Sequence, residues 1–164
     1  MTTKEHIAAR DLAGIDIFTE LSQQELEPLA RACTVREYQP GEHCAVQDEP
    51  TDELQVVGLG KVAIDMRIEV APYSQTLNLA SLAEGAVFNW SCLVGWTKHD
   101  VSARCIGKTK IICIKAADLL QILSERPFIE RIVMKNLARV INQRLKDSRA
   151  QLTRLIIEMI NQGR

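Results

Sequence analysis

The hydrophobic and polar positions along the chain divide it into a helical beginning, a strand-rich middle and a helical end. Residues Lys4 to Phe18 and the stretch 21–33 follow the helical period, with apolar side chains on one face of the second stretch. Ser22 is followed by Glu25 three residues later, which is typical of a capping box at the start of a helix. The sequence therefore predicts two short helices before the first strand.

The middle of the chain has a period of two. Pro and Gly residues interrupt the alternation, as in the turn Gln39-Pro40-Gly41-Glu42. Eight short strands separated by such turns indicate an antiparallel sandwich or barrel. The predicted strands are Thr34–Tyr38, His43–Gln47, Leu54–Val57, Lys61–Met66, Arg67–Val70, Thr76–Leu82, Val101–Cys105 and Lys110–Ile114.

The helical period returns after the last strand. Residues Ala116 to Leu123 predict a short helix, and Pro127 suits the first turn of a longer one. From Phe128 to Asn161 there is no Pro or Gly, so the long helix is expected to run uninterrupted. The polar residues of this helix are assigned to its exposed face, namely Arg139, Arg144, Lys146, Asp147, Arg149 and Arg154.

The long helix also carries a heptad seam, with successive spacings of four and three residues. Its members are Ile141, Leu145, Ser148, Leu152, Leu155 and Met159. A helix of about 50 Å, at ~1.5 Å per residue, is too long to lie wholly across a small β-domain. We expect the seam to meet the same helix of a second copy, giving a homodimer; the alternative is a helix folded back on its own domain. The predicted division is 1–125 for the β-domain with its N-terminal helices and 126–164 for the dimerisation helix.

The candidate site lies in the segment from Gly85 to Ala103, GAVFNWSCLVGWTKHDVSA. A short apolar turn with small residues is followed by a polar loop, Gly95 to Asp100, that carries basic side chains. Backbone N–H groups in such a turn point inward and the loop supplies charge, which is how a β-scaffold can hold a small anion.

Composition narrows the class of protein. The 164 residues are 46% hydrophobic and 25% charged, with a formal net charge of −1, so no basic excess draws in nucleic acid. No apolar run approaches the ~20 residues of a membrane span, and the N-terminus lacks the apolar middle of a secretory signal, so we expect a cytoplasmic protein. Five cysteines without CxxC spacing are interpreted as small buried thiols.

The sequence contains no recognisable catalytic pattern. Its histidines, His6, His43 and His99, are too far apart for the metal site of a jelly-roll enzyme, and no nucleophile and base are paired. We therefore expect a non-enzyme.

The order of elements and the residues within them resemble the cyclic nucleotide-binding domain of the bacterial catabolite-activator and fumarate–nitrate-regulator superfamily. The resemblance covers Ile15 to Arg154 and rests on the stretches IFTELSQQELEPLA, YQPGEHCAVQ and LQVVGLGKVAI, the Gly-Ala-Val-Phe segment, and a long helix bearing RLKDS. It implies a mainly β fold with helices (α+β): a jelly-roll-like β-roll of about eight antiparallel strands, short N-terminal helices and one long C-terminal dimerisation helix.

Two departures from the family pattern concern the ligand. Family members that bind cyclic nucleotides usually have Phe-Gly-Glu where this chain has Phe88-Asn89-Trp90, and the indole of Trp90 can only donate a hydrogen bond. The position of the family's phosphate-binding Arg corresponds to His99 or a residue near it, with Asp100 beside it. Lys98 is another residue that could take the place of this Arg. Two lost charge-assisted contacts of ~1.5–3 kcal/mol each amount to about two to four decades in affinity. Tight binding of cyclic AMP or cyclic GMP is therefore not expected.

The segment still retains a small-residue turn, and Ser148 falls where the family places a hydroxyl that reaches the base. Trp90 either fills the pocket or stacks on a different planar ligand, a nucleotide or another small anion. A haem-sensing variant would need an axial ligand, for which Cys92 and His99 are the candidates. The predicted ligand-binding residues are Phe88, Asn89, Trp90, Ser91, Cys92, His99, Asp100 and Ser148.

The resulting hypothesis is a non-catalytic sensory or regulatory module, in which a ligand contacts the long helix and shifts the dimer between two packings. The sequence ends at Arg164, before the winged helix of the family's transcription factors would begin. We therefore expect contact with a downstream protein that the sequence does not identify. The alternatives are a ligand-free protein–protein interaction scaffold and a fragment of a longer regulator.

Overall fold

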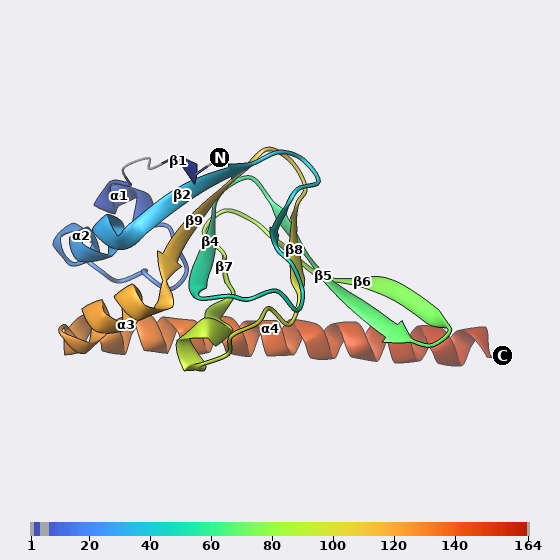
Figure 1. Ribbon diagram of the computed structural model, residues 1–164. Helices are drawn as coiled ribbons and strands as arrows, with labels where there is room; N and C mark the ends of the chain where they lie inside the picture. The colour runs from blue at the N-terminus through green and yellow to red at the C-terminus, as the bar shows by residue number, and fades with distance from the viewer. Residues whose placement is uncertain (1, 4–6, 164) are drawn as a thin grey trace.

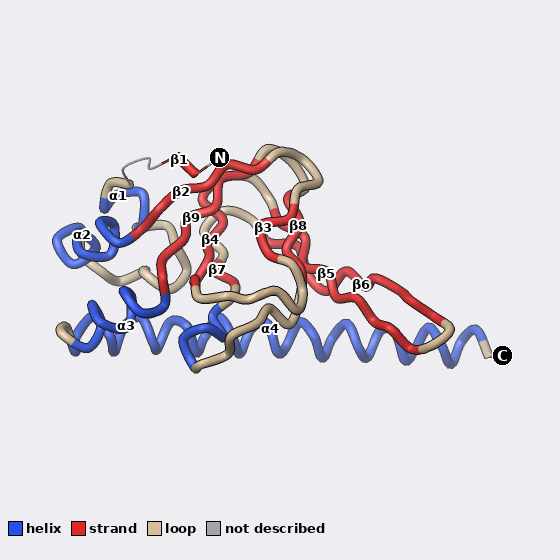
Figure 2. The backbone as a smooth tube through the Cα atoms, viewed as in Figure 1, coloured by secondary structure: helices blue, strands red, loops and turns tan. Residues whose placement is uncertain are grey.

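Two antiparallel sheets form the body of the molecule in the computed structural model, which describes residues 2–3 and 7–163. The five-stranded sheet has the order β1-β2-β9-β4-β7 and the four-stranded sheet the order β3-β8-β5-β6 (Figures 1 and 2). The strands are β1 (Thr2–Thr3), β2 (Cys33–Tyr38), β3 (His43–Ala45), β4 (Glu53–Leu59), β5 (Val62–Val70), β6 (Tyr73–Leu82), β7 (Val87–Phe88), β8 (Ser102–Cys105) and β9 (Thr109–Lys115).

The predicted fold class is confirmed: β2 to β9 are antiparallel strands of a β-roll flanked by helices. Two details of the strand prediction were wrong. The predicted strands 61–66 and 67–70 form one strand, β5, because β6 pairs with it continuously apart from a bulge at Ile64/Asp65. Val87 and Phe88, predicted as part of a turn, form β7 against β4.

Four α-helices and one 3-10 helix accompany the sheets in the described part of the chain. The predicted capping box is present, since the Ser22 N–H donates to the Glu25 carboxylate at 2.7 Å and the Glu25 N–H to the Ser22 hydroxyl at 3.3 Å. Of the predicted first helix, 4–18, residues 4–6 lie outside the described residues, and only Ala9–Leu12 of the rest forms an α-helix. The helices are α1 (Ala9–Leu12), α2 (Gln23–Ala32), η1 (Trp90–Val94, the 3-10 helix), α3 (Ala116–Ser124) and α4 (Pro127–Gln162).

The first part of α4 belongs to the core, and the rest does not. Ile129, Val133 and Leu137 are buried in one cluster with the N-terminal helices, α3 and the five-stranded sheet. Beyond Val140 the apolar side chains of α4 are exposed, and the helix extends along the β5–β6 hairpin (Figure 1). The side chain of Gln151 donates to the Asn78 carbonyl oxygen at 3.1 Å, which ties this part of α4 to the hairpin.

The cysteines are free, and three of them, Cys92, Cys105 and Cys113, are buried. Burial raises the pKa of the Cys33 thiol to about 12 and that of Cys113 to about 11. Both thiols therefore stay protonated near neutral pH, which agrees with their interpretation as small core residues.

Gly85 joins the N-terminal segment to the β-roll where no side chain fits. Its φ is +85°, its carbonyl oxygen accepts from the Asp16 N–H at 3.0 Å, and a Cβ would lie 2.5 Å from the Gly14 carbonyl oxygen. We expect Gly85→Ala to lower the free energy of unfolding by about 2–4 kcal/mol in urea denaturation. Gly41 also has φ +85° but an added Cβ meets nothing within 4 Å, so Gly41→Ala should cost only about 1 kcal/mol. Equal losses in the two variants would show that the contact with Gly14 is unimportant.

Candidate ligand-binding site

The segment after β7 is held by one buried side chain of β4. Asn89 adopts a left-handed conformation, with φ 59°, and η1 begins directly after it at Trp90. Asn tolerates this conformation better than most residues. The Asn89 carboxamide donates to the side-chain oxygen of Gln55, which is only 3% exposed. This contact fixes where Trp90 leaves the β-roll.

Trp90 lines a cavity between the β-roll and α4 that we call the Trp90 cavity. Its volume is about 290 Å³, and side chains of β5, β6, β7, η1, the loop before β8 and α4 surround it. Six of the eight predicted site residues come together here. The lining residues are Ile64, Leu79, Ala80, Leu82, Phe88, Asn89, Trp90, Ser91, Asp100, Val101, Arg144, Asp147 and Ser148.

The two other predicted site residues, Cys92 and His99, lie outside the Trp90 cavity. Cys92 is buried, and its thiol donates to the Asn89 carbonyl oxygen at 3.0 Å. The loop that carries His99 is paired with the segment after β3: the His99 N–H donates to the Glu49 carbonyl oxygen at 2.9 Å, and the Asp48 N–H donates to the His99 carbonyl oxygen at 2.8 Å. Lys98 forms a bridge with Pro50 in the same pairing. These backbone bonds direct His99 to a different cavity, which corrects its expected place beside Trp90.

The long helix contributes a cation that the sequence interpretation had placed on its exposed face. The Arg144 guanidinium lies 6.0 Å from the centre of the Trp90 ring, a cation–π contact. Burial lowers the pKa of Arg144, while the carboxylates of Asp16 and Asp147 act in the opposite direction. Arg144 precedes Ser148 by four residues, so the helical period already placed both on one face. That spacing is the signal from which Arg144 could have been found.

The charges of the Trp90 cavity do not favour a phosphate. Among the described lining residues Arg144 is the one cation, and Asp100 and Asp147 oppose it. The β-roll side of the cavity supplies Asp100 and uncharged side chains only. Trp90 forms part of the wall without closing the cavity, whose volume is just below the ~300–1,000 Å³ of typical small-molecule pockets.

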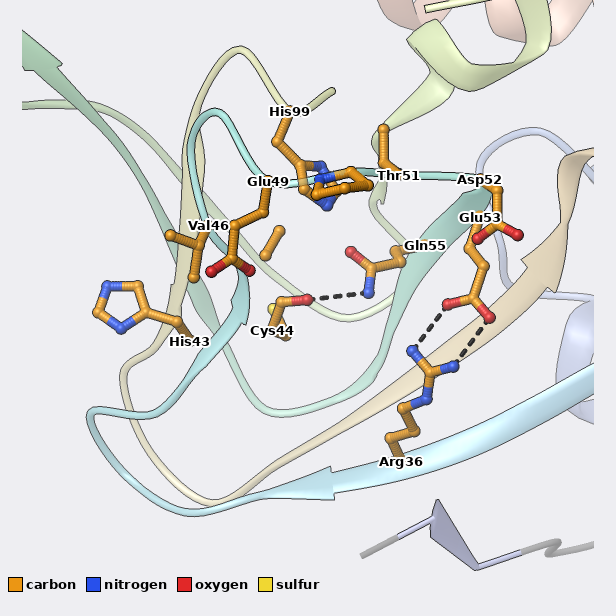
Figure 3. Close-up of a pocket in the computed structure, with 12 residues that line it drawn as sticks. Arg36, His43, Cys44, Val46, Glu49, Thr51, Asp52, Glu53, Gln55 and His99 are labelled. Atoms are coloured by element: carbon orange, nitrogen blue, oxygen red, sulfur yellow. Dashed lines mark hydrogen bonds and ion pairs between the residues drawn. The ribbon is translucent and has the colours of Figure 1, made fainter. Parts of the chain in front are cut away.

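His99 lines a second, more polar cavity of about 200 Å³, which we call the His99 cavity (Figure 3). At one side the Arg36 guanidinium donates two hydrogen bonds to the Glu53 carboxylate, at 2.7 and 2.8 Å. Gln55 separates the two cavities, since its amide nitrogen donates to the Cys44 carbonyl oxygen at 3.1 Å and its oxygen accepts from Asn89. The lining residues are Arg36, His43, Cys44, Ala45, Val46, Glu49, Pro50, Thr51, Asp52, Glu53, Gln55 and His99.

His99 makes folding stability depend on pH. Burial lowers its pKa below the ordinary 6.5, although the carboxylates of Asp100 and Glu49 act against the shift. As the pH falls below about 6.5 the unfolded chain binds a proton before the folded one does, so the free energy of unfolding decreases until the folded pKa is reached. In urea denaturation the natural protein should have a larger free energy of unfolding at about pH 7.5 than at about pH 5.5. The His99→Gln variant should show a smaller difference between these two values. The control His43→Gln, at an exposed residue, should keep it.

The comparisons with known proteins agree with this architecture. The family model for the cyclic nucleotide-binding domain matches residues 35–126, more than half of the 164 residues. No curated protein matches the chain. A cyclic nucleotide-binding domain from Methylobacillus flagellatus KT has a similar structure, with a TM-score of 0.76 and 17% identity over 89% of this chain and 80% of that one.

Two regulators also have this fold. The catabolite activator protein of Thermus thermophilus has a TM-score of 0.69 and 24% identity over 87% of this chain. The c-di-GMP-responsive global regulator of Xanthomonas campestris has a TM-score of 0.72 and 20% identity over 82% of this chain. This chain spans 64% and 65% of their respective lengths. At these identities the likeness shows the fold alone, but together with the family match it identifies the chain: it belongs to the cyclic nucleotide-binding domain family.

Proposed function

We propose that this chain is a non-catalytic regulatory module of the cyclic nucleotide-binding fold that does not hold cyclic AMP or cyclic GMP tightly. The family match and the similarity to two regulators support a sensory or regulatory role. In this proposal residues 1–125 form the β-roll side of the ligand cavity, and residues 126–164 complete the cavity and make the contact with a second copy. The module acts in the cytoplasm through a protein partner rather than through nucleic acid.

The observation that carries the proposal is the composition of the Trp90 cavity. Trp90 occupies the position at which the resemblance expects a ribose-binding Glu, and the β-roll wall offers no cation to a cyclic phosphate. Arg144 comes from the opposite wall and is already opposed by Asp16 and Asp147. A cyclic phosphate would therefore enter a cavity whose lining is net negative, which disfavours it.

The same lining supports a non-catalytic role. Ser91 and Ser148 supply hydroxyl groups to the Trp90 cavity, and its charged side chains are two carboxylates and Arg144. No histidine, lysine or cysteine of the described chain lines it. His99, the nearest candidate base in the sequence, lies in the other cavity.

The exposed seam of α4 supports a homodimer. Leu145, Leu152 and Met159 are 47%, 59% and 72% exposed in the single chain, although they follow a heptad spacing. Ser148 belongs both to this seam and to the lining of the Trp90 cavity. A ligand that contacts Ser148 would therefore act directly on the helix that meets the second copy, provided that it binds the two dimer packings with different affinity.

A ligand-free scaffold is the second candidate, and the Arg144 contact favours it. The guanidinium of Arg144 on α4 lies over Trp90 and fixes the helix against the β-roll. In a scaffold this contact would permanently hold the packing that a ligand would otherwise induce.

Calorimetric titration with cyclic AMP and cyclic GMP tests the proposed function. We expect no saturable binding tighter than about 100 µM, two decades weaker than micromolar. A parallel thermal-shift panel of planar and anionic small molecules separates the two candidates, because a ligand sensor gains stability by RT ln(1 + [L]/Kd) and a scaffold does not. Micromolar binding of either cyclic nucleotide would contradict the proposal.

A further inference from the structure

The His99 cavity lies outside the site to which the proposed function refers, and it has a fixed framework. Its floor comes from β2, β3 and β4, and its roof from the loop 46–52 and the loop before β8. Besides the two bonds of the His99 backbone, the Thr51 N–H donates to the Thr97 carbonyl oxygen at 2.9 Å. The roof is therefore bonded along its length rather than free to collapse onto the floor.

One buried atom at this cavity has no partner. Within residues 7–163, Nδ1 of His99 is the sole buried side-chain nitrogen or oxygen without a hydrogen-bond partner. Because burial keeps the ring neutral near pH 7, one ring nitrogen carries a lone pair, and a proton on Nε2 leaves that lone pair on Nδ1. A buried polar atom without a partner is unfavourable and calls for an explanation such as a bound molecule.

A second acceptor at the cavity is also unused. The Glu49 carboxylate makes no hydrogen bond or ion pair in the described structure, yet it is close enough to His99 to act on the pKa of that ring. In Figure 3 it points from the roof loop toward His43 and Cys44. Glu49 and His99 thus present an anionic and a neutral acceptor to the same space.

The other charged side chains at the cavity determine whether it favours a cation or an anion. The side chains of Arg36 and Glu53 neutralise each other through their two hydrogen bonds. Asp52 is paired with Lys115 at 3.9 Å, with both side chains exposed, which leaves the Glu49 carboxylate as the unpaired charge of the cavity. The cavity therefore favours a cation. The described residues include no group of three His, Cys, Asp or Glu side chains that could hold a metal ion, which leaves an organic cation.

We propose that the His99 cavity binds a small organic cation with an ammonium or guanidinium group, which donates hydrogen bonds to the Glu49 carboxylate and to Nδ1 of His99. A volume of about 200 Å³ equals roughly seven water molecules at ~30 Å³ each, so the ligand is a small amine or guanidine and not a nucleotide. The cation supplies only N–H donors, as both acceptors require.

Amide chemical-shift mapping of the full chain with methylguanidinium chloride tests the proposal, with methylurea as an uncharged probe of the same shape. We expect saturable shifts confined to the amides of residues 43–55 and 97–100, and at least about tenfold weaker binding of methylurea. Glu49→Gln should weaken methylguanidinium binding by at least about tenfold as well. Glu27→Gln, which removes another exposed carboxylate, on α2, should leave methylguanidinium binding unchanged.

Three outcomes overturn the proposal. The first is shifts that spread over the acidic surface without saturating, or no shifts at all. The second is equal binding of methylguanidinium and methylurea, because charge would then play no part. The third is binding that Glu49→Gln and Glu27→Gln weaken equally. Since the Glu49 side chain is exposed and makes no hydrogen bond or ion pair in the described structure, its substitution should leave the fold intact, and the spectrum of the free variant checks this.

Discussion

A chain carrying both Leu152→Glu and Met159→Glu is expected to behave as a single copy in sedimentation velocity at concentrations where the natural protein has twice the chain mass. The two residues are seven apart and lie on one face of α4, and they are exposed in the single chain, so the substitutions spare the core. In a homodimer each would bury an unpaired carboxylate in an apolar seam. Two such groups per chain should weaken the dimer by at least about a hundredfold, ~3 kcal/mol.

Ile157→Glu is the matched control for this experiment. Ile157 is 52% exposed at the same end of α4, but it follows Leu152 by five residues and points about 140° away from it, at ~100° per residue. The control should remain dimeric with the natural affinity. A natural protein that sediments as a single copy would contradict the seam interpretation, and so would equal weakening by Ile157→Glu.

Most of the architecture could be predicted from the sequence, because the period of apolar positions follows local geometry. Three features depend only on residues that are close together in the sequence. They are the capping box at Ser22, the Pro40-Gly41 turn and the uninterrupted helix after Pro127. The strand errors occurred where pairing overrides the local pattern. β5 continues through residue 67 because β6 lies beside it, and β7 exists because β4 offers an edge to Val87 and Phe88.

The site was less predictable, because it depends on contacts between distant segments. The sequence placed Phe88, Trp90 and Ser148 in one pocket through the resemblance, and they do line one cavity. His99 is only nine residues after Trp90, yet backbone pairing with residues 48–51 directs it to another cavity. No local pattern contains that pairing. Arg144 was missed for a different reason: a charged residue on a long helix was assumed to face solvent.

The geometry also identifies where a cyclic nucleotide site would have to be rebuilt. His99 is the wrong position for a phosphate-binding cation, because it does not line the Trp90 cavity, whereas Asp100 does. The double variant Trp90→Glu, Asp100→Arg places a ribose acceptor and a guanidinium on the β-roll wall. It also changes the net charge of the described lining residues from −1 to 0, since Glu adds one negative charge and replacing Asp by Arg adds two positive ones.

We expect this double variant to bind cyclic AMP about two to four decades more tightly than the natural protein in calorimetric titration. Each restored charge-assisted contact contributes ~1.5–3 kcal/mol, and ~1.4 kcal/mol corresponds to one decade.

Trp96→Glu with Asp100→Arg is the control, because Trp96 is exposed on the same loop as Asp100 and does not line the cavity. The control should gain at most the affinity for cyclic AMP that the phosphate contact contributes, about one to two decades. If the double variant folds, as its thermal unfolding will show, and still binds no more tightly than the natural protein, then the loss of nucleotide affinity does not arise from these two positions. Asp147, the carboxylate of α4 that lines the cavity, would then be the group that keeps the nucleotide out.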